Sequence, residues 1–426
     1  MPDLAAARNA LRSTFGFEDF RPGQGAIIET VLAGADVLAI MPTGSGKSLC
    51  YQLPALLRDD LTVVVSPLIA LMRNQVAQLR SHGIAAASLN SANDFLENRQ
   101  ITERLAGGGL RLVYVSPERL AQPDTLALLK RAKVGLLAVD EAHCISQWGH
   151  AFRPEYLALG AAQAALGGVQ TVAFTATADA ATRADIVGKL FHRDPAVFVH
   201  GFDRPNLRLC VRAKTSRRGQ MTSGLGQITD FVRARVGQSG IIYCGSRRKT
   251  EEIADFLRAG GANARPYHAG LEPSLRSRHQ DMFLREDGVI IVATIAFGLG
   301  IDKPDVRFVL HADLPANIES YYHEIGRAGR DGLPADTLTL FGAGDIRLRR
   351  MQIAQSKASD AQKDIDRKRL DALVTLCEST HCRRQNLLAY FGEAAPPCGN
   401  CDICLEPPGW WRRWRALWRR RRPVPP

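Results

Sequence analysis

Long apolar runs are missing from this sequence: within its 426 residues, no stretch approaches the roughly 18 to 20 apolar residues that a helix needs to cross a bilayer. Residues 1–12 include an early acidic residue and no uninterrupted hydrophobic segment, which is not the pattern of a secretory signal. A short-period internal repeat is absent as well. We therefore expect no transmembrane segment and no secretion, and we predict a cytoplasmic location.

The cysteines do not form the pattern of a disulfide framework. Five of the nine are scattered in or beside apolar segments, as buried free thiols are, and four lie within 23 residues of one another. In a chain without a secretory signal, such a cluster predicts metal binding. The scattered cysteines are Cys50, Cys144, Cys210, Cys244 and Cys377, and the clustered ones are Cys382, Cys398, Cys401 and Cys404.

Acidic residues are fewer than basic ones, and the formal net charge of +12 favours a polyanionic partner such as nucleic acid. Seven of the positive charges are arginines in the last 17 residues. The rest of the chain is only mildly basic, so individual sites carry more of the functional argument than the total charge does.

Hydrophobic residues make up 46% of the chain and charged residues 23%, as in soluble globular proteins, and the length predicts two or three domains. Short Val/Ile/Leu-rich runs without polar alternation predict strands that are buried on both faces, and helical stretches separate them. These features favour two α/β lobes with mostly parallel sheets, joined by a polar linker at 213–226. The predicted strands are 36–40, 61–66, 110–116, 134–140, 171–177, 240–244, 288–294, 306–313 and 336–341.

The segment MPTGSGKS at 41–48 follows a predicted strand and precedes a helical stretch, as a phosphate-binding loop does. Gly44 and Gly46 let backbone N–H groups face phosphates, Lys47 supplies a positive charge, and the Ser48 hydroxyl can ligate Mg²⁺. Met41 stands where the common pattern begins with glycine. Alone, such a turn could be an ordinary loop.

A pair of carboxylates at the end of a second strand supports the nucleotide site. Asp140 would hold the Mg²⁺ through water, and Glu141 would orient or deprotonate the attacking water. Two acids at a strand end are also common at helix starts, but here they follow the phosphate loop by about 90 residues with strands between. We include His143, in the same segment, among the candidate catalytic residues.

Two arginines in the second lobe are candidates for the γ-phosphate. The segment HEIGRAGRDG at 323–332 carries Arg327 and Arg330 three residues apart, which in a helix places them on one face. Such arginines could neutralise charge in the transition state, and ATP would then bind between the lobes, coupling hydrolysis to their closure. The alternative is a solvated basic helix end.

With these motifs in this order, the sequence closely resembles the RecQ family of superfamily two DNA helicases over roughly 15–407. The most diagnostic stretch is DEAHCISQWGHAFRPEY at 140–156, in which aromatic residues beside an arginine follow the acid pair. Rings of this kind can stack on unpaired bases, although aromatic residues are more often part of a core. Asn74 stands where the family usually has Asp, and His323 where it usually has Gln.

The resemblance implies further site residues. In the segment FGFEDFRPGQ at 15–24, Gln24 would read the adenine edge with Arg21 nearby. FTATA at 174–178 would couple hydrolysis to movement. The remaining nucleotide-binding candidates are Thr43, Ser45, Gly300 and Asp302, and the DNA-binding candidates are Ser66, Pro67, Ser116, Trp148, His150, Phe152, Arg153 and Thr294.

The four clustered cysteines have the composition of a structural zinc site. Cys398, Cys401 and Cys404 are spaced three apart, and with Cys382 they supply four thiolates, which leave no open position for catalysis. CRRQNLLAYFGE followed by PCGNCDIC resembles the zinc segment of the RecQ family. His381 could substitute for a ligand, and Cys377 is a less favoured candidate.

The resemblance implies RecA-like lobes at 1–208 and 209–344, followed by a small helical zinc-binding subdomain at 345–408. We expect the basic Trp/Arg tail at 409–426 to be disordered, although a helix there would be amphipathic and could anchor on DNA phosphates or an anionic membrane. Members of the family usually continue into a winged-helix domain and a helical domain, and we expect this chain to be a short form without them. An accidental terminus is another interpretation of the tail.

The function predicted from these features is an ATP-dependent DNA helicase that uses ATP, Mg²⁺ and Zn²⁺ and translocates 3′-to-5′ on single-stranded DNA. We expect it to unwind duplexes as a monomer, to act on single-stranded and forked DNA in repair and recombination, and to associate with the nucleoid. The alternative is a DNA-stimulated ATPase and translocase that unwinds weakly without a winged helix. A non-catalytic DNA-binding protein and an RNA helicase fit the motifs less well.

Overall fold

The computed structural model describes residues 3–146, 152–215, 224–295, 297 and 303–405. These form two compact units, one ending at Phe202 and the other beginning at Asp203. The predicted boundary at 208 falls just inside the first strand of the second unit, which begins at Leu207. No helix within the described ranges is long and apolar enough to cross a membrane.

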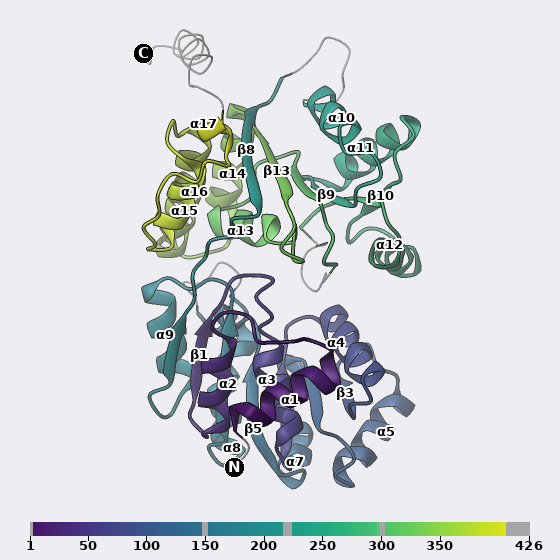
Figure 1. Cartoon of the computed structure of the whole chain (residues 1–426), viewed down its shortest axis with the longest axis vertical. Coiled ribbons are helices and arrows are strands. Elements are labelled where there is room, and N and C mark those ends of the chain that lie inside the picture. The colour runs from purple at the N-terminus through teal and green to yellow at the C-terminus, as the bar shows by residue number, and fades with distance from the viewer. Residues whose placement is uncertain (1–2, 147–151, 216–223, 296, 298–302, 406–426) are drawn as a thin grey trace. The chain divides into compact units, whose positions relative to one another are not determined.

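The first unit is a seven-stranded parallel sheet with helices against it, in the strand order β3-β4-β2-β5-β6-β1-β7 (Figure 1). Buried apolar residues of α1 to α4 pack on one face of the sheet and form its main core. The strands are β1 (Val37–Ile40), β2 (Leu61–Val65), β3 (Ala86–Leu89), β4 (Leu112–Val115), β5 (Val134–Val139), β6 (Gln170–Thr175) and β7 (Ala196–Val199). The helices are α1 (Leu4–Phe15), α2 (Gln24–Leu32), α3 (Leu49–Leu57), α4 (Ile69–Ser81), α5 (Phe95–Ala106), α6 (Pro117–Leu120), α7 (Pro123–Arg131), α8 (Leu159–Ala165) and α9 (Ala180–Leu190), with 3₁₀ turns at Ala142–Ile145 and Pro154–Ala158.

The second unit is a six-stranded parallel sheet in the order β10-β11-β9-β12-β13-β8. Helices α10 and α11 pack on one face of this sheet. The strands are β8 (Leu207–Ala213), β9 (Gly240–Tyr243), β10 (Ala264–Tyr267), β11 (Ile290–Ala293), β12 (Phe308–His311) and β13 (Ala335–Phe341). The helices are α10 (Leu225–Arg233), α11 (Arg247–Ala259), α12 (Pro273–Arg285), α13 (Ile318–Ile325), α14 (Ala343–Gln355), α15 (Asp360–Glu378), α16 (Arg383–Tyr390) and α17 (Asp402–Leu405).

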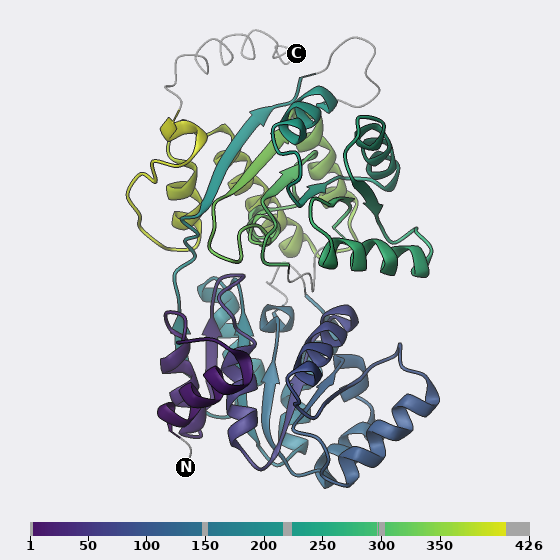
Figure 2. The ribbon, with the colours of Figure 1, turned by 45° about the vertical axis from the view of Figure 1, so that its right-hand side comes forward.

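The last helices that the structure describes belong to this second unit. In Figure 2 the yellow segment with α16 and α17 lies beside β8, the strand at one edge of the sheet, and a bridge pairs Leu209 of β8 with Cys401. Helices α14 and α15 follow β13, so the predicted helical character of the segment that begins at 345 is confirmed as far as Glu378.

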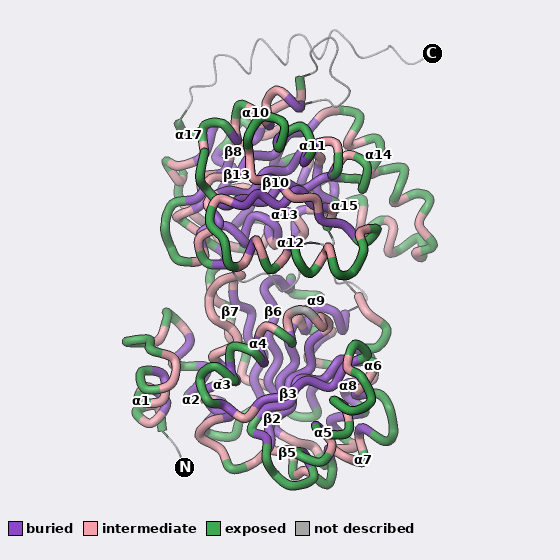
Figure 3. Tube along the Cα trace, turned by 90° about the vertical axis from the view of Figure 1, so that its right-hand side faces the viewer, coloured by how far each residue is buried: buried purple, intermediate pink, exposed green. Residues whose placement is uncertain are grey.

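Burial follows the pattern that the sequence predicted. Figure 3 shows most strands of both sheets as buried, with exposed residues on the outer sides of the helices. Strand β7, at one edge of the first sheet, contains only half-buried and exposed residues. All residues of β1, β2, β4 and β6 are buried, as expected for strands covered on both faces. The predicted fold class of two parallel-sheet lobes followed by a helical segment is confirmed.

Candidate functional site

Three neighbouring strands of the first sheet carry the nucleotide candidates. Strands β5, β6 and β1 lie side by side and parallel, so their carboxyl ends meet at one edge. The phosphate loop follows β1, Asp140 follows β5, and Thr175 ends β6. In open parallel sheets, ligands bind at this edge. The fold therefore brings the loop and the acid pair together although about 90 residues separate them.

The backbone of the predicted phosphate loop favours glycine at two positions. Gly44 and Gly46 have φ angles of 84° and 80°, in the left-handed region where residues with a side chain are strained. Ser48 is the N-cap of α3, which begins at Leu49, so the free N–H groups at the helix start face the same loop. A Cβ atom at Gly46 would lie 2.4 Å from Nε2 of Gln24, so a larger residue there would displace the Gln24 side-chain amide.

The side chain of Lys47 folds over the beginning of its own loop. Its Nζ donates to the carbonyl oxygens of Met41 and Pro42, at 3.2 and 3.4 Å. Its positive charge also acts to lower the pKa of Asp140, so the two residues are electrostatically linked within one site. This arrangement fits a triphosphate and Mg²⁺, which Lys47 and the carboxylate would hold from two sides.

Gln24 and Arg21 both contact the phosphate loop. The Gln24 side-chain amide donates to the carbonyl oxygens of Ser45 and Gly46, both at 3.0 Å, and its Oε1 accepts from the Arg21 backbone N–H at 2.8 Å. The Arg21 guanidinium donates to the Gly44 carbonyl. The resemblance implied that Gln24 reads adenine, and the structure places its side-chain amide against the backbone of the predicted phosphate loop.

Within the acid pair, Asp140 is buried and the backbone of Glu141 is strained. Asp140 is only 8% exposed, and burial, followed by the charge of Glu141, raises its pKa to about 7. Glu141 has a φ of 49°, which is unfavourable for a residue with a side chain. Burial and the charge of Glu141 disfavour the ionised form of Asp140. A divalent cation bound to this carboxylate would favour the ionised form, so the site suits a metal ion.

The burial of Asp140 leads to a prediction for the nucleotide-free protein. The folded state binds the Asp140 proton more tightly than the unfolded state does. This difference therefore contributes fully to the free energy of unfolding below pH 3.8, and the contribution is lost as the pH rises through about 7. Asp140→Asn cannot ionise, so we expect it to be more stable than the wild type at about pH 8, by on the order of 2 kcal/mol.

Thermal unfolding followed across pH measures this difference, which should shrink as the pH falls to about 4. Asp124→Asn, a change in the first turn of α7 away from the site, is the matched control. A destabilised Asp140→Asn at high pH would contradict the account of the buried carboxyl.

His143 joins the acid pair to β6. Its Nδ1 lies 2.9 Å from Oγ1 of Thr175 and 3.3 Å from a carboxylate oxygen of Glu141. The Thr175 hydroxyl also lies 3.1 Å from the Thr177 carbonyl. A chain of polar contacts therefore runs from Glu141 into the segment FTATA.

The DNA-binding candidates of the first unit follow the strands on the other side of β5. Ser66 follows β2 and Ser116 follows β4, and Arg153 donates to the Pro67 carbonyl at 3.2 Å. The Ser66 hydroxyl is buried without a hydrogen-bond partner among the described residues, whereas the Ser116 hydroxyl caps α6. Phe152 is half-buried, and Trp148 and His150 lie outside the described residues.

The predicted placement of the two arginines on one helical face is wrong. Helix α13 ends at Ile325, and Arg327 and Arg330 lie in the turn that follows. Gly329 within this turn has a φ of 56°, which no α-helix includes, so the chain leaves the helical path before the second arginine. Arg327 is 7% exposed, and Arg330 is half-buried.

The other candidates of the second unit lie near β11. Thr294 follows this strand, and its backbone N–H donates to the Tyr267 carbonyl at 3.2 Å. Gly300 and Asp302 lie outside the described residues.

A buried polar network next to the turn at 326–333, here called the arginine turn, was not predicted. His311 of β12 is fully buried, and its Nε2 lies 2.8 Å from a carboxylate oxygen of Glu324, three residues before Arg327. The Tyr243 ring stacks on His311, and its hydroxyl donates to the Phe297 carbonyl. The histidine at the end of the otherwise apolar strand β12 is the signal that could have identified this network.

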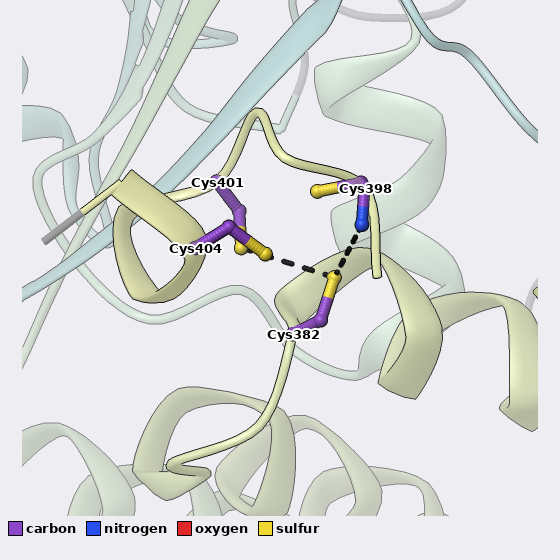
Figure 4. A group of neighbouring side chains, drawn as sticks. All are labelled: Cys382, Cys398, Cys401 and Cys404. Atoms are coloured by element: carbon purple, nitrogen blue, oxygen red, sulfur yellow. Dashed lines mark hydrogen bonds between the residues drawn. The ribbon is translucent and has the colours of Figure 1, made fainter. Parts of the chain in front are cut away.

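The four clustered cysteines face one another (Figure 4). Their sulfurs all lie within 4.8 Å of one another, and those of Cys382 and Cys401 are 3.9 Å apart. Thiolates around a tetrahedral zinc at about 2.3 Å lie about 3.8 Å apart, so the cluster fits this ion. Burial opposes ionisation of Cys382, but backbone N–H donors, among them that of Cys398, bring its pKa down to about 7, which favours the thiolate.

The residues next to the cysteines anchor the cluster to β8. Arg383 is fully buried and pairs with Asp402, whose other oxygen accepts from the Val211 backbone N–H at 3.1 Å. Cys377 is buried in α15, outside the cluster. The cysteines were predicted from their spacing, whereas Arg383 and Asp402 were not.

Three family models match this chain. "DEAD/DEAH box helicase" matches residues 21–186, "Helicase conserved C-terminal domain" matches 224–332, and "RecQ zinc-binding" matches 343–405. Together they cover both sheets and the cysteine cluster.

Similar proteins cover nearly the whole chain. "ATP-dependent DNA helicase RecQ" of Haemophilus influenzae is 47% identical over 403 residues, which are 94% of this chain and 64% of the relative. The protein of that name in Bacillus subtilis is 40% identical over 95% of this chain and 67% of its own length. The chain thus spans about two thirds of these relatives.

Solved structures share the fold at low sequence identity. The DEAD-box helicase Mss116 bound to single-stranded RNA and a nucleotide has a TM-score of 0.66 at 17% identity, covering 86% of this chain and 83% of Mss116. Helicase MrfA bound to DNA and AMPPNP has a TM-score of 0.66 at 16% identity, covering 93% of this chain and 59% of MrfA.

Proposed function

Because the chain belongs to the RecQ family, we propose that it is an ATP-driven motor that moves 3′-to-5′ along single-stranded DNA and unwinds duplexes. The observation that carries the proposal is the set of adjacent strand ends that hold the phosphate loop, the acid pair and Thr175. We further propose single-stranded and forked DNA as substrates, repair and recombination as the setting, a monomeric state, and a cytoplasmic location at the nucleoid.

The proposed hydrolysis uses few groups. Lys47 and the N–H groups of the phosphate loop would bind the ATP phosphates, and Ser48 and Asp140 would hold Mg²⁺. Bound Mg²⁺ supplies charge neutralisation on the phosphates. Glu141 orients the attacking water and accepts its proton, and Arg327 and Arg330 neutralise the charge that develops on the transferred phosphoryl group.

The proposed coupling to DNA passes along the carboxyl edge of the first sheet. Ser66, Pro67 and Ser116 stand beside the acid pair at this edge and would contact the DNA backbone. Glu141 and His143 are linked to Thr175 and Thr177 by the contacts given above. A shift of the backbone after β6 can therefore alter the position of the group that orients the water.

A direct test compares ATP hydrolysis and strand separation. We expect single-stranded DNA to raise kcat for ATP hydrolysis at least about tenfold and single-stranded RNA to have little effect, because in this motor hydrolysis is coupled to strand contact. Duplexes with a 3′ single-stranded tail should be unwound, and those with a 5′ tail should not. Stimulation by RNA alone, or unwinding only from a 5′ tail, would contradict the proposal, and DNA-stimulated hydrolysis with little unwinding would favour the translocase alternative.

A further inference from the structure

The segment at 203–207, with which the second unit begins, donates hydrogen bonds to the arginine turn. Arg204 donates to three carbonyl oxygens of this turn, those of Gly326, Ala328 and Gly329, at 3.2, 2.9 and 2.8 Å. Hydrogen bonds from a charged donor are about twice as strong as neutral ones. Each bonded carbonyl lies within four residues of both Arg327 and Arg330, so Arg204 fixes the backbone that carries them.

Asn206 closes the same turn from a second position. Its side-chain amide donates to the carbonyl oxygens of Gly329 and Leu333, at 2.8 and 2.9 Å. A Cβ atom at Gly329 would lie 2.4 Å from the Asn206 amide nitrogen, so the contact depends on glycine. The turn leaves the helical path at the place where this segment binds it.

The zinc-binding segment holds the same residues from another direction. Arg384, two residues after Cys382, is 6% exposed and donates to the carbonyl oxygens of Arg204 and Leu207. It also pairs with Asp203 at 3.3 Å. The chain of contacts therefore runs from the cysteine cluster through Arg384 and Arg204 to the arginine turn, entirely within the second unit.

We propose that Arg204 is a positioning residue for ATP hydrolysis: it holds the turn that presents Arg327 and Arg330, and Arg384 holds Arg204 in turn. The proposal rests on the proposed function of the two arginines. It also gives the zinc-binding segment a part in the rate of hydrolysis, in addition to its part in stability. A displacement of about 1 Å in a catalytic group can lower a rate by about 100-fold, so a clamp on the turn is expected to be visible in kcat.

The first test measures kcat and the affinity for ATP separately. We expect Arg204→Ala to lower the DNA-stimulated kcat by about 30-fold and to leave the Kd for ATP within about twofold, because the clamp acts on the transition state and not on ground-state binding. Arg204→Lys keeps the charge but not the geometry of the guanidinium, and should recover only part of the loss. Arg235→Ala is the matched control, since Arg235 pairs with Asp336 in the same unit and contacts neither segment.

The second test asks whether Arg204 acts through the arginines. In a background of Arg327→Ala with Arg330→Ala, we expect Arg204→Ala to lower kcat by less than about twofold, because the two side chains that Arg204 positions are already absent. A full 30-fold loss in that background would overturn the proposal, as would an unchanged kcat in the single variant. A wild-type protein without ATP hydrolysis would instead contradict the proposed function itself.

The third test concerns Arg384. Arg384→Ala at full zinc occupancy is expected to lower kcat by about fivefold, and by less than about twofold when Arg204→Ala is already present. If the alanine variant does not retain zinc, Arg384→Lys takes its place in the same comparison. An unchanged kcat at full zinc occupancy would overturn the part assigned to the zinc-binding segment.

Discussion

Replacing Lys47 with alanine is expected to lower kcat for DNA-stimulated ATP hydrolysis by about 1,000-fold, because the variant lacks the only side-chain charge of the phosphate loop. The Lys47 Nζ donates to the loop carbonyls of Met41 and Pro42, and we expect it to bind the β- and γ-phosphates of ATP. The same charge also lowers the pKa of Asp140 against the larger effect of burial. We therefore expect its removal to weaken both phosphate binding and the ionisation of Asp140, the carboxylate proposed to hold Mg²⁺.

Steady-state phosphate release with saturating single-stranded DNA measures this effect. Lys189→Ala is the matched control, because Lys189 pairs with Asp185 on α9 and lies in the same unit without contact to the loop. Circular dichroism should show that both variants keep the wild-type fold. ATP turnover that survives Lys47→Ala would contradict the proposed enzyme, and would favour a non-catalytic DNA-binding protein.

The strands named from the sequence are the interior strands of the two sheets. Continuous apolar runs mark strands covered on both faces, and all nine runs lie inside their sheets. The four strands that were not named, β3, β7, β8 and β10, are the four at the edges. Three of them, β7, β8 and β10, are only partly buried, so a search for continuous apolar runs does not find them. All four residues of β3 are buried, but this short strand contains Ala and Ser and lacks a Val/Ile/Leu run.

The sequence predicted the position of some site residues correctly and the local structure around others wrongly. Lys47, Asp140 and Glu141 follow from local motifs at strand ends, and the parallel topology brings them together. The arginine turn does not follow from spacing, because its path depends on carbonyl contacts with Arg204 and Asn206, more than 120 residues earlier in the chain. A pattern of residues along the chain gives the chemistry of a segment but not the distant groups that bend it.

Removal of one zinc ligand is the second change with a large expected effect. Cys401 is fully buried, and its sulfur accepts from the Arg383 backbone N–H at 3.4 Å, so Cys401→Ser is expected to abolish stoichiometric zinc binding. Binding to four thiolates contributes on the order of 10 kcal/mol in small zinc-binding domains, and this free energy is available for folding. In this variant we expect the segment that contains α16 and α17 to detach from β8. We also expect the unfolding temperature to be about 10 °C or more below that of the wild type.

Zinc content and thermal unfolding together measure this change. Cys210→Ser is the matched control, since Cys210 is half-buried on β8 and lies outside the cluster. If Cys401→Ser kept one zinc and the wild-type unfolding temperature, the cluster would not be the ligand set. Because Arg383 and Arg384 directly follow Cys382, loss of zinc should also release the buried pair with Asp402 and the grip on Arg204. Cys401→Ser should therefore lower kcat at temperatures where the two sheets are still folded, and Cys210→Ser should not.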